Sequence, residues 1–133
     1  MTAREGRNET GGFTVARYCF GGNRGSQESW SGLARVIYEE CLCRELQARN
    51  ITCDRQVELP VCYKGERLRG GYRVDVVVDK LVILELKAVG KLQPIYQAQL
   101  LTYLRLSNIR LGFLLNFNVL LMKDGIRRVV NNL

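Results

Sequence analysis

The sequence predicts an α/β fold in which a mixed β-sheet is flanked by helices. Helical patterns occupy about 29–49 and 94–106, and strand-like patterns follow the first of them at 51–63, 66–69, twice within 71–87, at 109–118 and at 126–130. The second helix separates the strand that ends at Lys87 from the strand 109–118, which allows a parallel crossover after an antiparallel hairpin. We therefore expect a sheet with both kinds of pairing, covered by helices.

The two predicted helices have recognisable ends. Ser29 or Ser31 can cap the first helix, which runs to about Arg49 and is followed by Asn50 as its C-terminal cap. The second helix begins at Pro94, a residue favoured in the first helical turn. The spacing of apolar residues in the first helix predicts a buried stripe made of Leu33, Val36, Ile37, Cys41 and Leu42.

The strands differ in pattern. Polar and apolar residues alternate over 51–63, as in a half-buried strand. Lys64-Gly65 predicts a turn into a short return strand, and Gly70-Gly71 predicts a break before the central strands. The segment 109–118 is mostly apolar, which is typical of burial on both faces. A turn at Lys123-Asp124-Gly125 leads to the last strand.

The chain has 133 residues, with 20 Lys and Arg against 13 Asp and Glu and a formal net charge of +7. This length indicates one domain. We place it at 29–133, after a flexible N-terminal segment of residues 1–28 that is rich in small and polar residues. A basic domain suits a polyanionic partner such as nucleic acid, because phosphate contacts dominate such binding. The same charge also fits simple solubility, and both interpretations stay open.

Five cysteines and no histidine limit the possible chemistry. The odd number fits a reduced, cytoplasmic protein whose cysteines are mostly small core residues. The absence of histidine excludes Ser-His and Cys-His nucleophilic sites, and the cysteine spacing matches no zinc finger. No apolar run is long enough to predict a membrane span, and residues 1–12 lack the apolar core of a signal peptide.

The most informative stretch is 71–87, in which Asp75 precedes Glu85-Leu86-Lys87. Side chains alternate along a strand. If two strands turn around Lys80, Asp75 lies opposite Glu85. The same register gathers six apolar residues on one face: Val74, Val76, Val78, Val82, Leu84 and Leu86. A one-residue slip would mix the two faces, so burial of one face selects this register.

The opposite face of this hairpin would gather two carboxylates and an ammonium, from Asp75, Glu85 and Lys87. Cross-strand partners have Cβ atoms about 5 Å apart, close enough for both carboxylates to share one hard divalent cation beside a phosphodiester. The other interpretation is an exposed ladder of salt bridges, in which Arg73 and Lys87 balance the two acids. The spacing alone favours neither.

Five stretches carry a family resemblance: Gly32 to Leu42, Gly71 to Asp75, Val82 to Val89, Gln97 to Leu104 and Leu115 to Asn118. Through them the chain resembles the PD-(D/E)XK nuclease superfamily and, within it, the GxxExxY family of small bacterial proteins. The resemblance covers about three quarters of the chain. It implies a restriction-endonuclease-like fold, a mixed four-stranded core sheet flanked by helices, to which the hairpin 51–69 is an addition.

The resemblance also implies roles for individual residues. Asp75 and Glu85 would bind Mg²⁺ or Mn²⁺ together with the backbone carbonyl of Leu86. Lys87 would be the lysine of the E-x-K motif and would assist hydrolysis. The residues expected to contact nucleic acid are Gln99, Tyr103, Arg73, Arg35 and Lys91. Gln99 and Tyr103 match a Q-x-x-x-Y helix motif, although an amphipathic helix with one polar position explains them equally well.

Arg35 departs from the family pattern. In Gly32 to Tyr38, arginine stands where the motif G-x-x-E-x-x-Y has a glutamate, which in the superfamily often completes the metal shell. An arginine opposes metal binding by its charge but can reach a phosphate. Glu39, one helical turn further on, is an alternative carboxylate.

Three functions are compatible with these residues. The leading one is a metal-dependent nuclease that hydrolyses phosphodiester bonds of DNA, for which a homodimer is one compatible assembly. The alternative is a catalytically degenerate nucleic-acid-binding module of the same fold, motivated by Arg35. The third is a protein-interaction domain whose basic surface meets an acidic partner.

Overall fold

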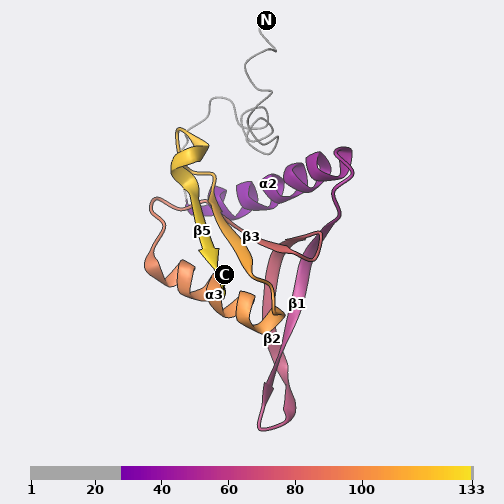
Figure 1. Cartoon of the computed structure of the whole chain (residues 1–133). Coiled ribbons are helices and arrows are strands. Elements are labelled where there is room, and N and C mark those ends of the chain that lie inside the picture. Colours follow the sequence, from indigo (N-terminus) through magenta and orange to yellow (C-terminus); the bar gives the residue numbers. More distant parts are fainter. Residues whose placement is uncertain (1–27, 133) are drawn as a thin grey trace, which may run out of the picture.

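The computed structural model describes residues 28–132 (Figure 1). Their elements are α2 (Glu28–Ala48), β1 (Cys53–Tyr63), β2 (Glu66–Val78), β3 (Val82–Lys87), α3 (Pro94–Ser107), β4 (Leu111–Asn116), the 3₁₀ helix η1 (Met122–Gly125) and β5 (Ile126–Val130). The flexible segment predicted at the N-terminus falls, apart from Glu28, on residues 1–27, which lie outside the described residues.

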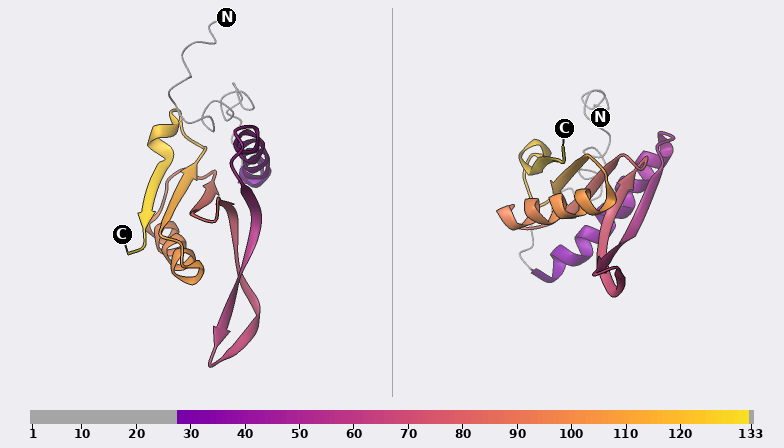
Figure 2. Two further views of the ribbon diagram at one scale, coloured as in Figure 1. Left: turned by 45° about the vertical axis from the view of Figure 1, so that its right-hand side comes forward. Right: turned by 60° about the horizontal axis from the view of Figure 1, so that its bottom comes forward.

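The strands form one five-stranded mixed sheet in the order β1-β2-β3-β4-β5. Only the pair β3–β4 is parallel, because α3 crosses over between these two strands; the other neighbours are antiparallel. The two helices cover opposite faces of the sheet (Figure 2). The predicted α/β fold is confirmed. The expected four-stranded core and extra hairpin are one continuous sheet, because β1 and β2 make the hairpin and also extend the sheet.

Each face of the sheet has its own apolar core. The core on the α3 side of the sheet consists of Leu59, Val74, Val77, Ile83, Leu100, Leu104 and Leu114. The core on the α2 side consists of Leu42, Cys43, Val76, Leu86, Leu115 and Phe117. The central strand β4 contributes to both cores, which confirms the prediction of burial on both faces. Among the described residues, neither helix is long and apolar enough to cross a membrane.

The buried stripe of α2 differs from the predicted one. Leu33, Val36 and Ile37 are exposed. The helix instead packs on the sheet with Tyr38, Leu42, Cys43 and Leu46, and Glu39 is buried beside them. Apolar residues occur on more than one side of this helix, so their spacing could not select the side that meets the sheet.

Strand β2 continues through Gly70 and Gly71, where the sequence predicts a break, but its register against β1 shifts between Arg67 and Gly71. Gly71 pairs with Pro60 of β1, and a Cβ atom added to Gly71 would lie 2.6 Å from the carbonyl oxygen of Leu59. The glycine therefore permits a close approach of two backbones, one of the reasons for glycine inside a strand.

The turn between β1 and β2 is the predicted pair Lys64 and Gly65. Both residues have positive φ, of 50° and 81° respectively. Positive φ at both central residues is the requirement of a type I′ turn, whose twist matches that of a hairpin.

We predict that Gly71→Ala destabilises the protein by about 1–3 kcal/mol, because the new methyl group meets a backbone atom that cannot move aside. Gly70→Ala is the matched control, since nothing lies within 4 Å of a Cβ atom there. Urea unfolding of both variants measures the difference. Equal stability of the two variants would contradict the close approach at Gly71.

Candidate active site

The candidate site lies where β2 and β3 separate. Their regular pairing consists of Val76 with Leu84, Val77 with Ile83 and Val78 with Val82, which is the predicted register. Beyond it, the backbone N–H of Asp75 donates to Glu85 Oε1 at 3.0 Å, and the N–H of Leu86 donates to Asp75 Oδ2 at 2.9 Å. Each carboxylate thus binds the backbone of the opposite strand.

One part of the predicted face assignment is wrong. Val76, Val78, Leu84 and Leu86 pack together toward α2, as expected, but Val74 packs in the other core, toward α3. The alternation of β2 changes sides between Val74 and Val76, so that the Asp75 carboxylate also points toward α2.

A matching irregularity in the neighbouring strand explains this change of side. Gln56 of β1 stands across from Asp75, between the pairs Arg55–Val76 and Val57–Val74, and has a φ of 51°. Positive φ is uncommon for a residue other than glycine, and such strained positions cluster at functional sites. Its side chain reaches the same polar group, with Nε2 donating to Asp75 Oδ1 at 3.5 Å.

Both central carboxylates are buried: Asp75 is 4% exposed and Glu85 is 7% exposed. The pKa of Glu85 is raised from 4.5 to about 7, mainly by burial and also by the negative charge of Asp75. The N–H of Asp75 and the cations Lys87 and Arg35 act in the opposite direction. These two cations do not offset the burial of the carboxyl and the charge of Asp75, and a bound metal ion would supply further positive charge.

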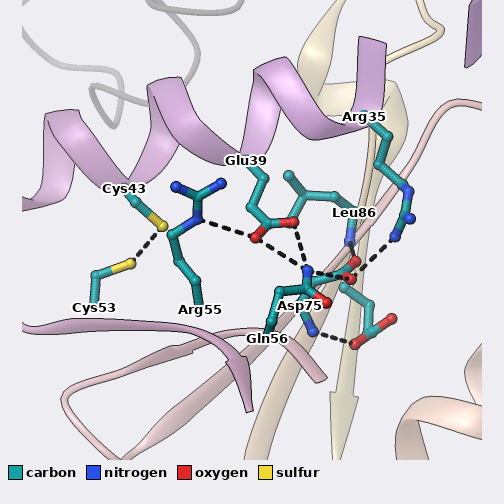
Figure 3. A network of polar contacts seen from close by, with 9 residues as sticks. Arg35, Glu39, Cys43, Cys53, Arg55, Gln56, Asp75 and Leu86 are labelled. Atoms are coloured by element: carbon teal, nitrogen blue, oxygen red, sulfur yellow. Dashed lines mark hydrogen bonds and ion pairs between the residues drawn. The ribbon is translucent and has the colours of Figure 1, made fainter. Parts of the chain in front are cut away.

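Arg35 of α2 occupies the remaining side of Asp75. Its Nη1 lies 3.0 Å from Asp75 Oδ1, and its side chain is 41% exposed (Figure 3). The sequence predicts a contact of Arg35 with nucleic acid; in the described residues it is the ion-pair partner of the predicted metal ligand.

Glu39 joins the same polar network, although the sequence predicts only a substitute role for it. It is 3% exposed, and its carboxylate accepts hydrogen bonds from Arg55 Nε at 3.1 Å and from Gln56 Nε2 at 2.9 Å. Gln56 therefore bridges Glu39 and Asp75 (Figure 3). The available signal was the helical spacing of Glu39 from Arg35; nothing in the strand pattern indicated Arg55 or Gln56.

Two buried or half-buried cysteines lie beside this network (Figure 3). Cys53 Sγ donates to Cys43 Sγ at 2.6 Å. Burial raises the pKa of both thiols, which makes them poor nucleophiles. Cys43 is the small core residue that the sequence predicts, whereas Cys62 is exposed.

Lys87 is half-buried at the end of β3, with its Nζ 4.6 Å from the ring centroid of Tyr96 on α3. It is close enough to Glu85 to lower the pKa of that carboxyl. Leu86 lies between them, with its side chain in the core and its N–H bound to Asp75. The three residues Asp75, Glu85 and Lys87 therefore come together, Asp75 from the side of α2 and Lys87 from the side of α3.

The other predicted contact residues differ in their surroundings. Tyr103 is half-buried, and its pKa is raised by burial and by the nearby Glu85. Its ring lies 5.3 Å from that of Tyr72. Arg73 is paired with Glu58 at 3.1 Å on the surface. The side chains of Gln99 and Lys91 are exposed and have no hydrogen bond or ion pair to any residue within 28–132.

Asn116 has a structural role that the sequence did not reveal. It is 2% exposed, and its amide both accepts from the N–H of Val89 at 3.1 Å and donates to the carbonyl of Val89 at 2.9 Å. The Phe117 ring stacks on Tyr38 at 4.2 Å. These contacts fix the segment after Lys87 and the middle of α2 against the end of β4.

The donor set suits a hard cation with few protein ligands. Among residues 28–132, no cluster of three or more acidic or cysteine side chains is placed to hold a metal ion. Asp75 and Glu85 provide two carboxylates, and Mg²⁺ in proteins is commonly held by one or two carboxylates with retained waters. The residues present fit such an ion once Arg35 leaves Asp75.

A mixed sheet with helices on both faces and two carboxylates at its parting strands defines a protein of the restriction-endonuclease-like class. The family model described as the PD-(D/E)XK nuclease superfamily matches residues 26–129, and the chain belongs to this superfamily. Its members generally use divalent metals, and membership implies a nucleic-acid substrate. The comparison with curated proteins found no match, and neither did the comparison with solved structures.

We predict that Glu85→Gln stabilises the metal-free protein at high pH. Because the folded pKa of about 7 lies above the ordinary 4.5, the folded state favours the protonated carboxyl. Its stabilising contribution is present below about pH 4.5 and is lost as the pH rises through 7. At about 1.4 kcal/mol per pKa unit, the variant gains about 3 kcal/mol over the wild type by pH 8.5.

Urea unfolding in EDTA at pH 4.5 and pH 8.5 measures this difference. Glutamine keeps an oxygen that can accept from the Asp75 N–H, so the fold is retained. Glu40→Gln, on the exposed side of α2, is the control. A gain that is the same at both pH values would rule out the titration of Glu85 as its source.

Proposed function

We propose that the protein is a metal-dependent nuclease that hydrolyses phosphodiester bonds of DNA, and that within its superfamily it belongs with the GxxExxY proteins. The observation that carries the proposal is the reciprocal arrangement of Asp75 and Glu85, two buried carboxylates at the parting of β2 and β3. Burying a carboxylate costs free energy unless it is paired with a positive charge or binds a metal ion.

In this proposal Asp75 and Glu85 hold Mg²⁺, or Mn²⁺, with the backbone carbonyl of Leu86 and waters completing the shell. Held there, such an ion would supply polarisation of the scissile phosphate and a lower pKa for an attacking water. Lys87 orients that water or neutralises the charge that develops on the phosphate. Its ammonium is already near Glu85 and is held over the face of Tyr96.

The substrate strand lies over α3 in this proposal. Tyr103 is close to Glu85 and Tyr72, and Gln99, one turn earlier, is exposed and free to bond a base or a sugar. Arg73 and Lys91, both exposed, contact the backbone. Two copies of the chain, one on each strand, would cut a duplex completely.

Arg35 has two states in this proposal. Without substrate it neutralises Asp75 at 3.0 Å. When metal and DNA bind, it moves to a phosphate, whose geometry suits its planar guanidinium. The exposed fraction of its side chain, 41%, leaves room for this movement.

We predict that the wild type cleaves labelled single- or double-stranded DNA with Mn²⁺ or Mg²⁺ and not with EDTA, and that Glu85→Gln abolishes cleavage while keeping the fold. Glu40→Gln is the control and retains activity, because Glu40 is an exposed partner of Arg44 on α2. Cleavage that persists in Glu85→Gln, or in EDTA, would refute the proposed site.

A second function is favoured by one observation. The ion pair of Arg35 with Asp75 places a cation at the predicted metal ligand, which suits a nucleic-acid-binding module that has lost catalysis. Such a module binds nucleic acid without metal, and its affinity falls with salt.

Arg35→Glu separates the two functions. The change removes the competing cation and adds a carboxylate in the family position. For a degenerate module we expect no cleavage by the wild type and a gain of Mn²⁺ binding in the variant, measured by isothermal titration calorimetry. For a working nuclease we expect weaker DNA binding and lower activity in the variant. Arg44→Glu, on the exposed side of the same helix, controls for the change in net charge.

A further inference from the structure

The outer part of the β1–β2 hairpin, residues 58–73, extends beyond the rest of the sheet, and we call it the arm. Strand β3 pairs with β2 only at 76–78, so no third strand from residues 28–132 accompanies the arm. All of its residues except Leu59 and Val61 are exposed. The ribbon views show the hairpin projecting away from both helices (Figures 1 and 2).

The dimensions of the arm match a groove of nucleic acid. Its strand Glu66 to Arg73 is about 26 Å long at about 3.3 Å per residue. It is a two-stranded antiparallel ribbon closed by the tight turn at Lys64-Gly65. The major groove of B-form DNA is about 12 Å wide and admits a two-stranded ribbon, whereas the minor groove, about 6 Å wide, does not.

The charges of the arm point to an anionic partner. It contains four basic residues, Lys64, Arg67, Arg69 and Arg73, and only two acidic ones, Glu58 and Glu66. Arg73 is neutralised by Glu58. Arg67 and Arg69 have no ion pair with any residue that the structure describes. Both lie on β2 in the outer part of the arm, so two free guanidinium groups are close together in the sequence on an exposed strand.

The base of the arm leads into the candidate site. Arg73 is two residues before Asp75 on the same strand, and Tyr72 contacts Tyr103, which lies near Glu85. A polyanion bound along the arm therefore continues past the carboxylates. A single strand would also be attracted by the charge, but it offers no groove for a ribbon.

We propose that the arm binds duplex DNA, with the ribbon in the major groove and Arg67 and Arg69 on phosphates beside it. This inference rests on the proposed function and adds to it the form of the substrate, which is double-stranded. The arm holds the duplex outside the site and determines its position relative to Asp75 and Glu85.

The test measures binding separately from cleavage. Fluorescence anisotropy with a 30-base-pair duplex and a 30-nucleotide single strand is recorded in EDTA between 50 and 200 mM NaCl. The protein is the full chain carrying Glu85→Gln, with and without Arg67→Gln plus Arg69→Gln. The matched control is Arg127→Gln plus Arg128→Gln, on the edge strand β5 far from the arm in sheet order. Circular dichroism checks that each variant folds.

The arm variant should bind the duplex about tenfold more weakly at 100 mM NaCl. Its slope of log K against log salt should be smaller by about 2, because each lost phosphate contact removes about 0.9 from the slope. The control should bind as the parent does, and the single strand should be affected less than the duplex. Binding should also protect guanine N7, which lies in the major groove, from dimethyl sulfate.

An unchanged duplex affinity in the arm variant would overturn the inference, as would an equal loss on single-stranded DNA or unprotected guanine N7. The proposed nuclease is judged independently by cleavage of a short substrate of about four nucleotides, which at about 3.4 Å per nucleotide is too short to reach along the arm. If this short substrate is cleaved and the arm variant binds the duplex normally, the proposed nuclease is supported and the proposed role of the arm is wrong. If the parent binds neither DNA at 50 mM NaCl, both the proposed nuclease and the proposed role of the arm are contradicted.

Discussion

The two hydrogen bonds that the carboxylates of Asp75 and Glu85 accept from the backbone N–H groups of Leu86 and Asp75 are the interaction on which the rest of the site depends. At this point the backbone ladder of β2 and β3 ends, and each acid binds the N–H of the other strand. The side chains thus do what carbonyl oxygens do elsewhere in the sheet. This holds two carboxylates together in a buried place, against their mutual repulsion and the loss of water around them. Lys87, Arg35 and Gln56 lie around these two carboxylates.

Helix α2 supplies the positive and polar groups that make this arrangement tolerable. Arg35 reaches Asp75 directly, while Glu39 acts through Gln56 and is itself balanced by Arg55. The helix therefore contributes one residue that competes with a cation and one that positions the strand partner. In the proposed relationship to the GxxExxY proteins, arginine in place of the motif glutamate changes the partner of Asp75 from an acid to a cation.

Much of the fold could be predicted from the sequence because apolar alternation fixes strand register. The pairing of Val76 with Leu84 followed from the requirement that one face be buried. The change of side at Val74 could not be predicted, since it depends on positive φ at Gln56, a residue type that seldom adopts it. Glu39 was difficult for a related reason. The apolar residues of α2 gave no unique buried side, so its neighbours could not be assigned before the sheet position was known.

The tight turn at Lys64-Gly65 also bears on the order in which the chain folds. Closing a two-residue loop is a microsecond event, whereas pairing β3 with β4 must wait for the intervening segment that contains all of α3. The long hairpin of β1 and β2 is therefore the natural first structure. It sets Gln56 across from Asp75 before either helix has docked. The irregular backbone at Gln56 and Asp75 would then form before the helices pack on the sheet, and would not be produced by that packing.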